Sequence, residues 1–351
     1  DAPVWRDLID LAYQLDGFPK YLAQHPGGMI FSSEPLTSMV PVQPSAKEGR
    51  YICHWDKNAI ESAGFIKIDF LALGTLSQMQ EVLQLIEDRE GRYLDLSRIN
   101  FADQDVYRSI HEADTIGIFQ VESAAQRQTT PRIRPVNLTD MAYEVAAVRP
   151  GVGANDGVTQ FIQRRNGAKW AYDHPLEERA LSRTLGVILF QDQVNQLATD
   201  VARFSTTQAD QLRRAFTTFS RRKGLEQVQR FLQEFREGAK SNGVGQETAD
   251  RIFKKFNGHY MFPEAHAFAF GVTAYHMAWL KYYYPLEFYV GIFNQQPMGF
   301  YSLETLKEDA RRHRVRVLNP DINHSLDKCI IKDEALLLGF LKVAGVGESG
   351  A

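Results

Sequence analysis

Asp69 is a carboxylate in the middle of an apolar segment, IKIDFLAL, where a charge without a partner would be costly. Alternation predicts a strand over 65–71 with two different faces: Ile66, Ile68 and Phe70 on one, Lys67, Asp69 and Leu71 on the other. The carboxylate must then be exposed at a cleft, paired with Lys67, or bound to a metal. Carboxylates on a sheet face supply the hard oxygen ligands with which Mg²⁺ supports phosphoryl transfer. By spacing alone, an ordinary surface pair of Lys67 and Asp69 is the more frequent explanation.

Basic side chains gather in the middle of the chain, and they are the second candidate for chemistry. They are Arg164 with Arg165, Arg213 with Arg214, and Arg221, Arg222 and Lys223. Guanidinium forks match the geometry of a triphosphate or of backbone phosphates. Cations at the carboxyl end of a helix also suit its dipole, and the last three residues are expected to end a helix there. A solvated basic face explains the same pattern equally well.

Glycine and histidine give weaker signals. The stretch RPGVGANDG, which begins at Arg149 and includes Gly151, allows close approach of backbone to a ligand, but it lacks the lysine and spacing of a P-loop. The nine histidines show neither an HExxH pattern nor zinc spacing. His266 opens a buried helix and is more typical of a hydrogen-bonded core histidine. Trp279 and the tyrosines at 282–284 are expected to be packing residues instead of a base-stacking platform.

Composition is that of an ordinary soluble globular protein, with 351 residues, 44% hydrophobic and 24% charged, enough for two or three domains. The two cysteines, Cys53 and Cys329, have no CxxC partner, which favours a reducing, cytoplasmic location. The amino terminus does not resemble a signal peptide, and the absence of an initiator methionine suggests a piece of a longer chain. The net charge is −3, yet residues 149–255 hold 18 Lys and Arg against 12 Asp and Glu. A polyanion is expected to bind there.

Periodicity predicts short strands early and helices after Gly74. Within Trp5–Tyr21 a short amphipathic helix is expected that ends near Gly17 and Pro19, and a strand is expected over Met29–Phe31. Ser205 with Gln208 forms a capping box, followed by a buried stripe of Leu212, Phe216 and Phe219, with Arg214, Thr218 and Arg221 on the exposed face. A buried central helix is predicted from Pro263 to about Tyr284; its charged residues argue against membrane insertion. Residues 332–343 indicate a hairpin or strand pair.

Eight segments in order carry a resemblance that no single motif would establish. They are HPGGMIFS, FIKIDFLALGTL, IGIFQVES, VRPG, LGVILFQDQV, ADQLRRA, FPEAHAFAFGVTAYHMAWLKYYYPLEF and LLGFLKVAGVGE. Together they span essentially the whole chain, which resembles the α subunit of bacterial DNA polymerase III.

The resemblance implies specific roles. Asp69 matches the third metal-binding aspartate of the palm, with Mg²⁺ as cofactor, and Lys67 matches a lysine that reaches phosphate. Arg213 and Arg214 match a pair that grips the triphosphate of the incoming nucleotide, and Arg149 to Gly151 and His266 line the same pocket. The basic residues Arg164, Arg165, Arg221, Arg222 and Lys223 are the candidates for contact with DNA.

The implied partners are a DNA primer-template and deoxynucleoside triphosphates, with a sliding clamp and other polymerase subunits reached through regions outside this chain, and no membrane. The family's first two catalytic aspartates form an Asp-x-Asp motif expected upstream of residue 1. The Asp103-x-Asp105 present here lies outside any matching context.

Two departures from the replicative pattern are informative. Ala124 stands where replicative members usually have an arginine, with Arg127 one turn on, and Phe262-Pro263-Glu264-Ala265-His266 replaces Phe-Asn-Lys-Ser-His. The Phe-Pro-Glu form is similar to the second, error-prone class of α subunit. Loss of a cation and a hydroxyl near the nucleotide could loosen selection.

The expected fold is α+β. The resemblance implies the end of a thumb over 1–24, part of a palm over 25–76, mostly helical fingers over 77–340 and the start of a helix-hairpin-helix region over 341–351. The expected function is template-directed nucleotidyl transfer by a two-metal mechanism in the full-length polymerase, with this piece alone inactive. The alternative is a non-catalytic DNA-binding accessory module of replication or repair.

Overall fold

The computed structural model describes most of the chain in ten stretches, and statements about structure below refer to these. They are residues 3–15, 25, 27–45, 49–70, 73–148, 156–217, 222–256, 262–299, 301–343 and 345–346. The chain divides into two compact units, Asp1–Leu73 and Gly74–Ala351, each of which is described by itself.

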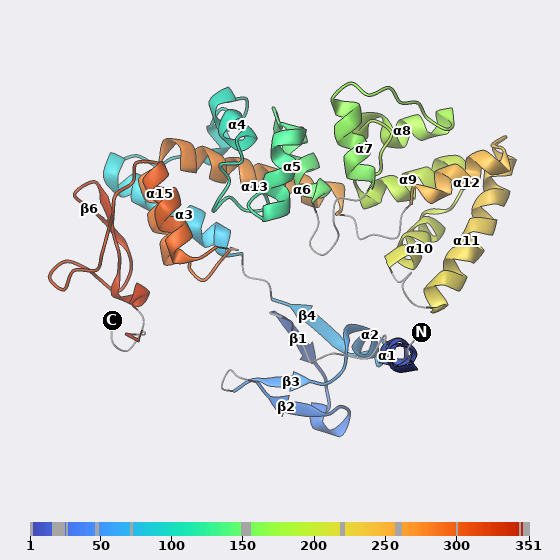
Figure 1. Ribbon diagram of the computed structural model, residues 1–351, viewed down its shortest axis with the longest axis horizontal. Helices are drawn as coiled ribbons and strands as arrows, with labels where there is room; N and C mark the ends of the chain where they lie inside the picture. The colour runs from blue at the N-terminus through green and yellow to red at the C-terminus, as the bar shows by residue number, and fades with distance from the viewer. Residues whose placement is uncertain are drawn as a thin grey trace. The chain divides into compact units, whose positions relative to one another are not determined.

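The first unit combines two short helices with two antiparallel pairs of strands (Figure 1). Its elements are α1 (Pro3–Leu15), β1 (Gly28–Phe31), β2 (Val42–Pro44), β3 (Tyr51–Cys53), α2 (Lys57–Ser62) and β4 (Ile66–Asp69). Strand β1 pairs with β4, and β2 pairs with β3. The strands predicted over 29–31 and 65–71 are confirmed as β1 and β4. The predicted helix is confirmed up to Leu15, and its predicted end near Gly17 and Pro19 lies outside the described residues.

The apolar face of the β1–β4 pair is largely exposed. Five side chains on it are 43–64% exposed: Met29, Phe31, Ile66, Ile68 and Phe70. The buried hydrophobic residues among the described part of this unit are Val40 and Ile60. A unit of this size with so small a core gains little stability from its own burial.

The second unit is almost entirely helical and ends in a small sheet (Figure 1). Its α-helices are α3 (Gly74–Glu90), α4 (Gln104–His111), α5 (Ala124–Ile133), α6 (Leu138–Ala147), α7 (Asp156–Arg165), α8 (Glu178–Leu181), α9 (Gln191–Ala202), α10 (Thr206–Thr217), α11 (Arg222–Ser241), α12 (Gln246–Lys254), α13 (Glu264–Tyr283), α14 (Pro285–Asn294) and α15 (Leu303–Arg312). The predicted α+β class, with a large helical region after Gly74, is confirmed.

Helix α13 is the central element of this unit, as its nearly uniform apolar character predicted. It begins after Pro263 and ends one residue before the predicted limit; Pro285 then opens α14. Helix α6 packs along α13, while α14 packs on α3 and α15. In the part of the chain that the structure describes, no helix is both long enough and apolar enough to cross a bilayer.

The carboxyl-terminal sheet contains a hairpin, as predicted, but it spans Ile330–Leu337 instead of 332–343, and Phe340–Lys342 form a short 3-10 helix. Strands β6 (Ile330–Lys332) and β7 (Ala335–Leu337) are antiparallel, and β5 (Val317–Leu318) adds to β7 in parallel. Asp333 and Glu334 both have positive φ, of 50° and 52°, which is the geometry of the two-residue turn that matches strand twist.

Candidate functional site

Lys67 and Asp69 lie on one face of β4, as the alternation of the sequence predicts. Gly28 is opposite Asp69 and Ile30 is opposite Lys67 in the β1–β4 register. The Lys67 ammonium donates a hydrogen bond to Asp69 Oδ1. The side chains are 25% and 41% exposed respectively, so the pair is open to a ligand.

His25 borders this pair and fixes the loop before β1. Its Nδ1 accepts hydrogen bonds from the backbone N–H groups of Gly28 at 2.6 Å and Gly27 at 3.2 Å. Because Nδ1 accepts, the ring proton of a neutral His25 lies on Nε2. The 3.9 Å separation between His25 Nδ1 and Asp69 Oδ1 is therefore a neighbouring position and not a hydrogen bond.

Gly28 has no side chain, and the space beside its Cα is occupied by His25, Lys67 and Asp69. A Cβ at this position would lie 2.8 Å from His25 Nδ1, 2.9 Å from Lys67 Cε and 3.0 Å from Asp69 Oδ1. A side chain here would push the charged pair out of place. The HPGG motif thus serves close packing of two polar side chains against a backbone.

A second arrangement of predicted site residues lies where helices α9, α10 and α13 meet. The capping box that starts α10 is confirmed: Gln208 N–H donates to Ser205 Oγ at 3.3 Å and Ser205 N–H to Gln208 Oε1 at 3.0 Å. Leu212 and Phe216 are buried as predicted, and Phe219, Thr218 and Arg221 lie outside the described residues.

Arg213 and Arg214 share one carboxylate. Asp210 Oδ1 accepts from Arg213 at 2.7 and 3.1 Å, and Asp210 Oδ2 accepts from Arg214 Nε at 2.8 Å. The hydrogen bonds from Arg213, above all, hold the pKa of Asp210 below its ordinary value. Arg213 also donates to Gln191 Oε1 at 3.2 Å, at the first residue of α9. The Arg214 side chain is 72% exposed, as predicted, and Arg213 is 22% exposed.

Helices α9 and α13 begin side by side. A parallel bridge joins Phe190 to Phe262, and Gln191 N–H donates to Phe262 O at 3.1 Å. The first backbone N–H of α13, at Glu264, donates to Asp192 Oδ2 at 2.7 Å. Two helix amino termini, which favour anions, therefore converge close to Arg213.

His266 lies in the first turn of α13 between two aromatic rings. It stacks on Phe262 with ring centroids 5.1 Å apart and meets Phe270 edge-on at 4.0 Å. Burial lowers its pKa. The side chain is half-buried, so its neutral imidazole is available to a ligand on the open side.

Arg164 and Arg165, predicted to contact DNA, have partners within the protein. Arg164 donates to Leu185 O at 2.6 Å and lies over the Trp170 ring. Arg165 makes a two-point contact with Asp140, at 2.6 and 2.7 Å, and donates to Ile133 O. Much of their donor capacity is used internally, and a role in DNA binding stays a prediction.

The predicted placement of the last basic cluster needs a correction. Arg222 and Lys223 open α11 instead of ending α10, so the argument from a helix carboxyl end is wrong for them. The capping box and the apolar stripe that follows it predict where α10 begins and which face is buried, but they do not predict that the helix ends before Arg222. Arg221 lies outside the described residues, as do Arg149 and Gly151, so their predicted roles are untested.

Asp103 caps α4, and Asp105 lies in the first turn of that helix. Asp103 Oδ1 accepts from the backbone N–H of Asp105, its other oxygen accepts from Tyr283 at 2.7 Å, and Asp105 pairs with Arg108. This agrees with their position outside any matching motif.

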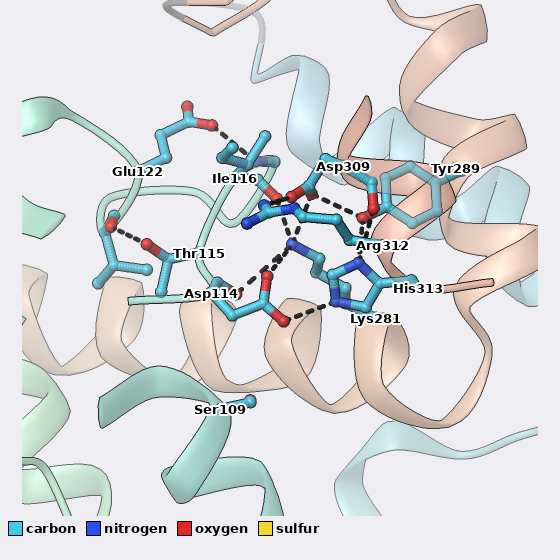
Figure 2. A network of polar contacts seen from close by, with 12 residues as sticks. Ser109, Asp114, Thr115, Ile116, Glu122, Lys281, Tyr289, Asp309, Arg312 and His313 are labelled. Carbon is cyan, nitrogen blue, oxygen red and sulfur yellow. Dashed lines mark hydrogen bonds and ion pairs between the residues drawn. The ribbon is translucent and has the colours of Figure 1, made fainter. Parts of the chain in front are cut away.

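The one cluster of metal-type ligands found among the described residues is filled by a lysine (Figure 2). Asp114, Asp309 and His313 converge, but Lys281 Nζ lies 2.8 Å from Asp114 Oδ1 and 2.8 Å from Asp309 Oδ2. An ammonium already supplies the positive charge that a metal would bring. Asp69 is thus the remaining candidate that the sequence singled out for a metal, and it offers one carboxylate.

Sequence reasoning missed Gln191, Asp192 and Arg183. The first two lie in the quoted segment LGVILFQDQV, where acidic and amide side chains at a helix start were a usable signal. Arg183 gave none, because its partner Glu264 is 81 residues away. Tyr282 and Tyr283, predicted to be packing residues, are 44% and 45% exposed, because they lie on the outer face of α13 while the neighbouring Lys281 is buried.

Comparison with known proteins is consistent with these observations. Residues 1–72 match the bacterial DNA polymerase III alpha NTPase domain, and residues 75–243 match the bacterial DNA polymerase III alpha subunit finger domain. The chain belongs to the bacterial DNA polymerase III α-subunit family.

Curated relatives agree over nearly the whole chain. An error-prone DNA polymerase of Vibrio parahaemolyticus is 42% identical over 99% of this chain and 34% of its own length. An error-prone DNA polymerase of Vibrio campbellii is 44% identical over 91% of this chain and 31% of its own length. One of Corynebacterium diphtheriae is 39% identical over 97% of this chain and 33% of its own length. The chain spans about a third of the length of these relatives.

Proposed function

We propose that this chain is the palm-end and fingers part of an error-prone DNA-directed DNA polymerase. The observation that carries the proposal is the arginine fork of Arg213 and Arg214 beside two helix amino termini. Guanidinium forks and the positive ends of two helix dipoles together suit a triphosphate, which is the substrate class that the family requires.

In this proposal the incoming triphosphate replaces Asp210 as the anion that the fork binds. Asp210 holds both guanidinium groups in place before the ligand binds. Binding therefore costs little side-chain entropy, because the arginines are already ordered. His266, neutral and half-buried, would contact the sugar or base without adding charge. Arg149 and Gly151 are proposed to complete this pocket.

Asp69 would hold Mg²⁺ together with carboxylates from elsewhere in the polymerase, and Lys67 would contact phosphate. The residues fit in part, since one exposed carboxylate provides hard oxygen ligands but not a whole site. When bound, Mg²⁺ would stabilise the negative charge that develops on the phosphoryl oxygens. The primer 3′ oxygen would join the α-phosphorus, and pyrophosphate would leave with the broken bond.

The remaining assignments follow from the same proposal. The thumb, palm, fingers and helix-hairpin-helix limits at residues 24, 76 and 340 are part of it, as are a sliding clamp and other subunits as partners. Arg164, Arg165, Arg221, Arg222 and Lys223 remain proposed DNA contacts. This piece alone is proposed to lack primer extension, since one metal-binding aspartate is not a site.

The test is primer extension with Mg²⁺ by the polymerase that carries this chain, comparing wild type with Asp69→Asn. We expect extension to be lost while DNA binding and thermal stability are retained. Asp105→Asn is the matched control, because that side chain is 51% exposed and pairs with Arg108. Undiminished extension by Asp69→Asn would contradict the assignment, and DNA binding without extension by the wild type would favour an accessory module.

A further inference from the structure

Arg183 and Glu264 form a two-point ion pair between segments far apart in the sequence. Arg183 lies in the short turn Ser182–Thr184, and Glu264 is the first residue of α13. Arg183 Nη2 donates to Glu264 Oε2 at 2.7 Å, and Nη1 donates to Oε1. The Arg183 side chain is 53% exposed and that of Glu264 is 20% exposed. The fork geometry fixes orientation as well as distance.

The backbone of each partner is tied to another helix. The carbonyl of Arg183 accepts a hydrogen bond from the Tyr143 hydroxyl at 2.9 Å, which connects it to α6. The N–H of Glu264 donates to Asp192, which connects it to α9. Because α6 also packs along α13, the ion pair closes a ring of contacts through α6, the Ser182–Thr184 turn and α13, and Asp192 ties α9 to that ring.

These elements carry the residues proposed to bind the incoming nucleotide. Helix α9 presents Gln191 to Arg213, and α13 carries His266 two residues after Glu264, in the same first turn. Helix α6 ends at Ala147, two residues before Arg149. The placement of the first turn of α13 against α9 thus sets the separation between His266 and Arg213.

Charge gives the pair a second role. A carboxylate at the first residue of α13 suits the helix dipole, but it would repel a triphosphate bound near the same helix end. Arg183 neutralises that carboxylate by direct contact. A site with glutamate at this position therefore needs a paired cation to accept an anionic substrate.

We propose that Arg183 and Glu264 are positioning residues that set α13 and His266 for the incoming nucleotide and shield the triphosphate from the Glu264 carboxylate. This inference rests on the proposed function. It identifies two side chains, outside the arginine fork itself, that determine how tightly the incoming nucleotide is bound.

The experiment measures single-nucleotide insertion by the polymerase that carries this chain. Arg183→Glu places two carboxylates face to face, and we expect KM for the incoming nucleotide to rise by about fivefold or more, the effect of losing a partly exposed pair and adding repulsion. Values of kcat and the Kd for primer-template DNA should change little.

In the reversed pair, Arg183→Glu with Glu264→Arg, KM should return to within about twofold of wild type. Arg311→Glu is the matched control, since Arg311 is 58% exposed and pairs with Glu308 on α15.

Two further readouts keep the inference testable. Arg183→Lys keeps the charge but loses the fork, so it should raise KM less than Arg183→Glu does. A KM for Arg183→Glu equal to that of the Arg311→Glu control, or no recovery in a folded reversed pair, would overturn the inference while leaving the polymerase assignment intact. Failure of the wild-type polymerase to extend a primer would instead overturn the proposed function, and this inference with it.

Discussion

Lys281 Nζ lies 2.8 Å from Oδ2 of Asp309, whose side chain has no exposure to solvent (Figure 2). The lysine side chain is itself only 3% exposed, and Asp114 is its second carboxylate partner. Burial alone would raise the pKa of Asp309, but the charge and hydrogen bond of Lys281 hold it below its usual value. A hydrogen bond from His313 together with the charge of Lys281 likewise holds the pKa of Asp114 below its usual range, so both carboxylates stay ionised.

We expect Lys281→Met to lower the free energy of unfolding by about 3–5 kcal/mol, because two carboxylates lose their buried partner. Urea denaturation of the chain at pH 7 measures this. Lys307→Met is the control: its partner Glu304 is 73% exposed, so the loss should stay within about 1 kcal/mol. Equal losses in the two variants would show that the buried network contributes no more than a surface pair.

Glu144 carries a proton in the folded chain, as hydrogen-bond geometry indicates. Thr130 Oγ1 lies 2.8 Å from Gln126 O and 2.8 Å from Glu144 Oε1, yet a hydroxyl has one proton to donate. The carbonyl can only accept, so Thr130 donates there and accepts from the Glu144 carboxyl group. Burial raises the pKa of Glu144 to about 8, in agreement with this assignment.

The raised pKa predicts a definite pH dependence for Glu144→Gln. The folded state binds the proton more tightly than the unfolded state, so wild-type stability from this group is complete below the unfolded pKa and is lost as pH rises to about 8. Relative to wild type, the variant should gain stability from about pH 4.5 upward, by at most about 1.4 kcal/mol per pH unit. Urea denaturation from pH 4.5 to 9 measures the difference, with exposed Glu308→Gln as control. A difference that is constant across this range would contradict a neutral Glu144.

Arg165 is expected to support the fold through Asp140, whose side chain is 6% exposed. Arg165→Lys replaces a fork with a single point charge, so the free energy of unfolding should fall by about 1–3 kcal/mol. Arg98→Lys, at an 86% exposed site, is the control. Unchanged stability together with weaker, less salt-sensitive DNA binding would instead show that Arg165 acts mainly on phosphates.

Local chemistry determined which parts of the structure could be predicted from the sequence. The β4 alternation and the Ser205 capping box depend on residues a few positions apart, and both are confirmed. The contacts that organise the sites are long-range: Arg183 with Glu264, and Lys281 with Asp114, 167 residues away. A single sequence contains no periodic signal for such pairs.

The burial of individual side chains on the central helix α13 was the other feature that the sequence could not predict. The apolar composition of α13 correctly predicted a core helix, but a helix that is apolar almost all round gives no signal for which of its faces stays exposed. Tyr282 and Tyr283 lie on that face, beside the buried Lys281. Similarly, the motif that contains Asp69 indicated the residue to examine, whereas the crowding of Gly28 against it required the structure.

A side chain at Gly28 should displace its neighbours, because a Cβ there would meet both His25 and the Lys67–Asp69 pair at 3.0 Å or less. We expect Gly28→Ala to displace Asp69 and to lower kcat for primer extension by at least about tenfold, a cost typical of misplaced catalytic groups. Its effect on DNA affinity should be small. Gly245→Ala is the control, since a Cβ there would meet nothing within 4 Å. If Gly28→Ala extended primers as fast as Gly245→Ala, the position of Asp69 relative to β1 would not matter for the chemistry, and the metal-binding role proposed for Asp69 would lose its geometric support.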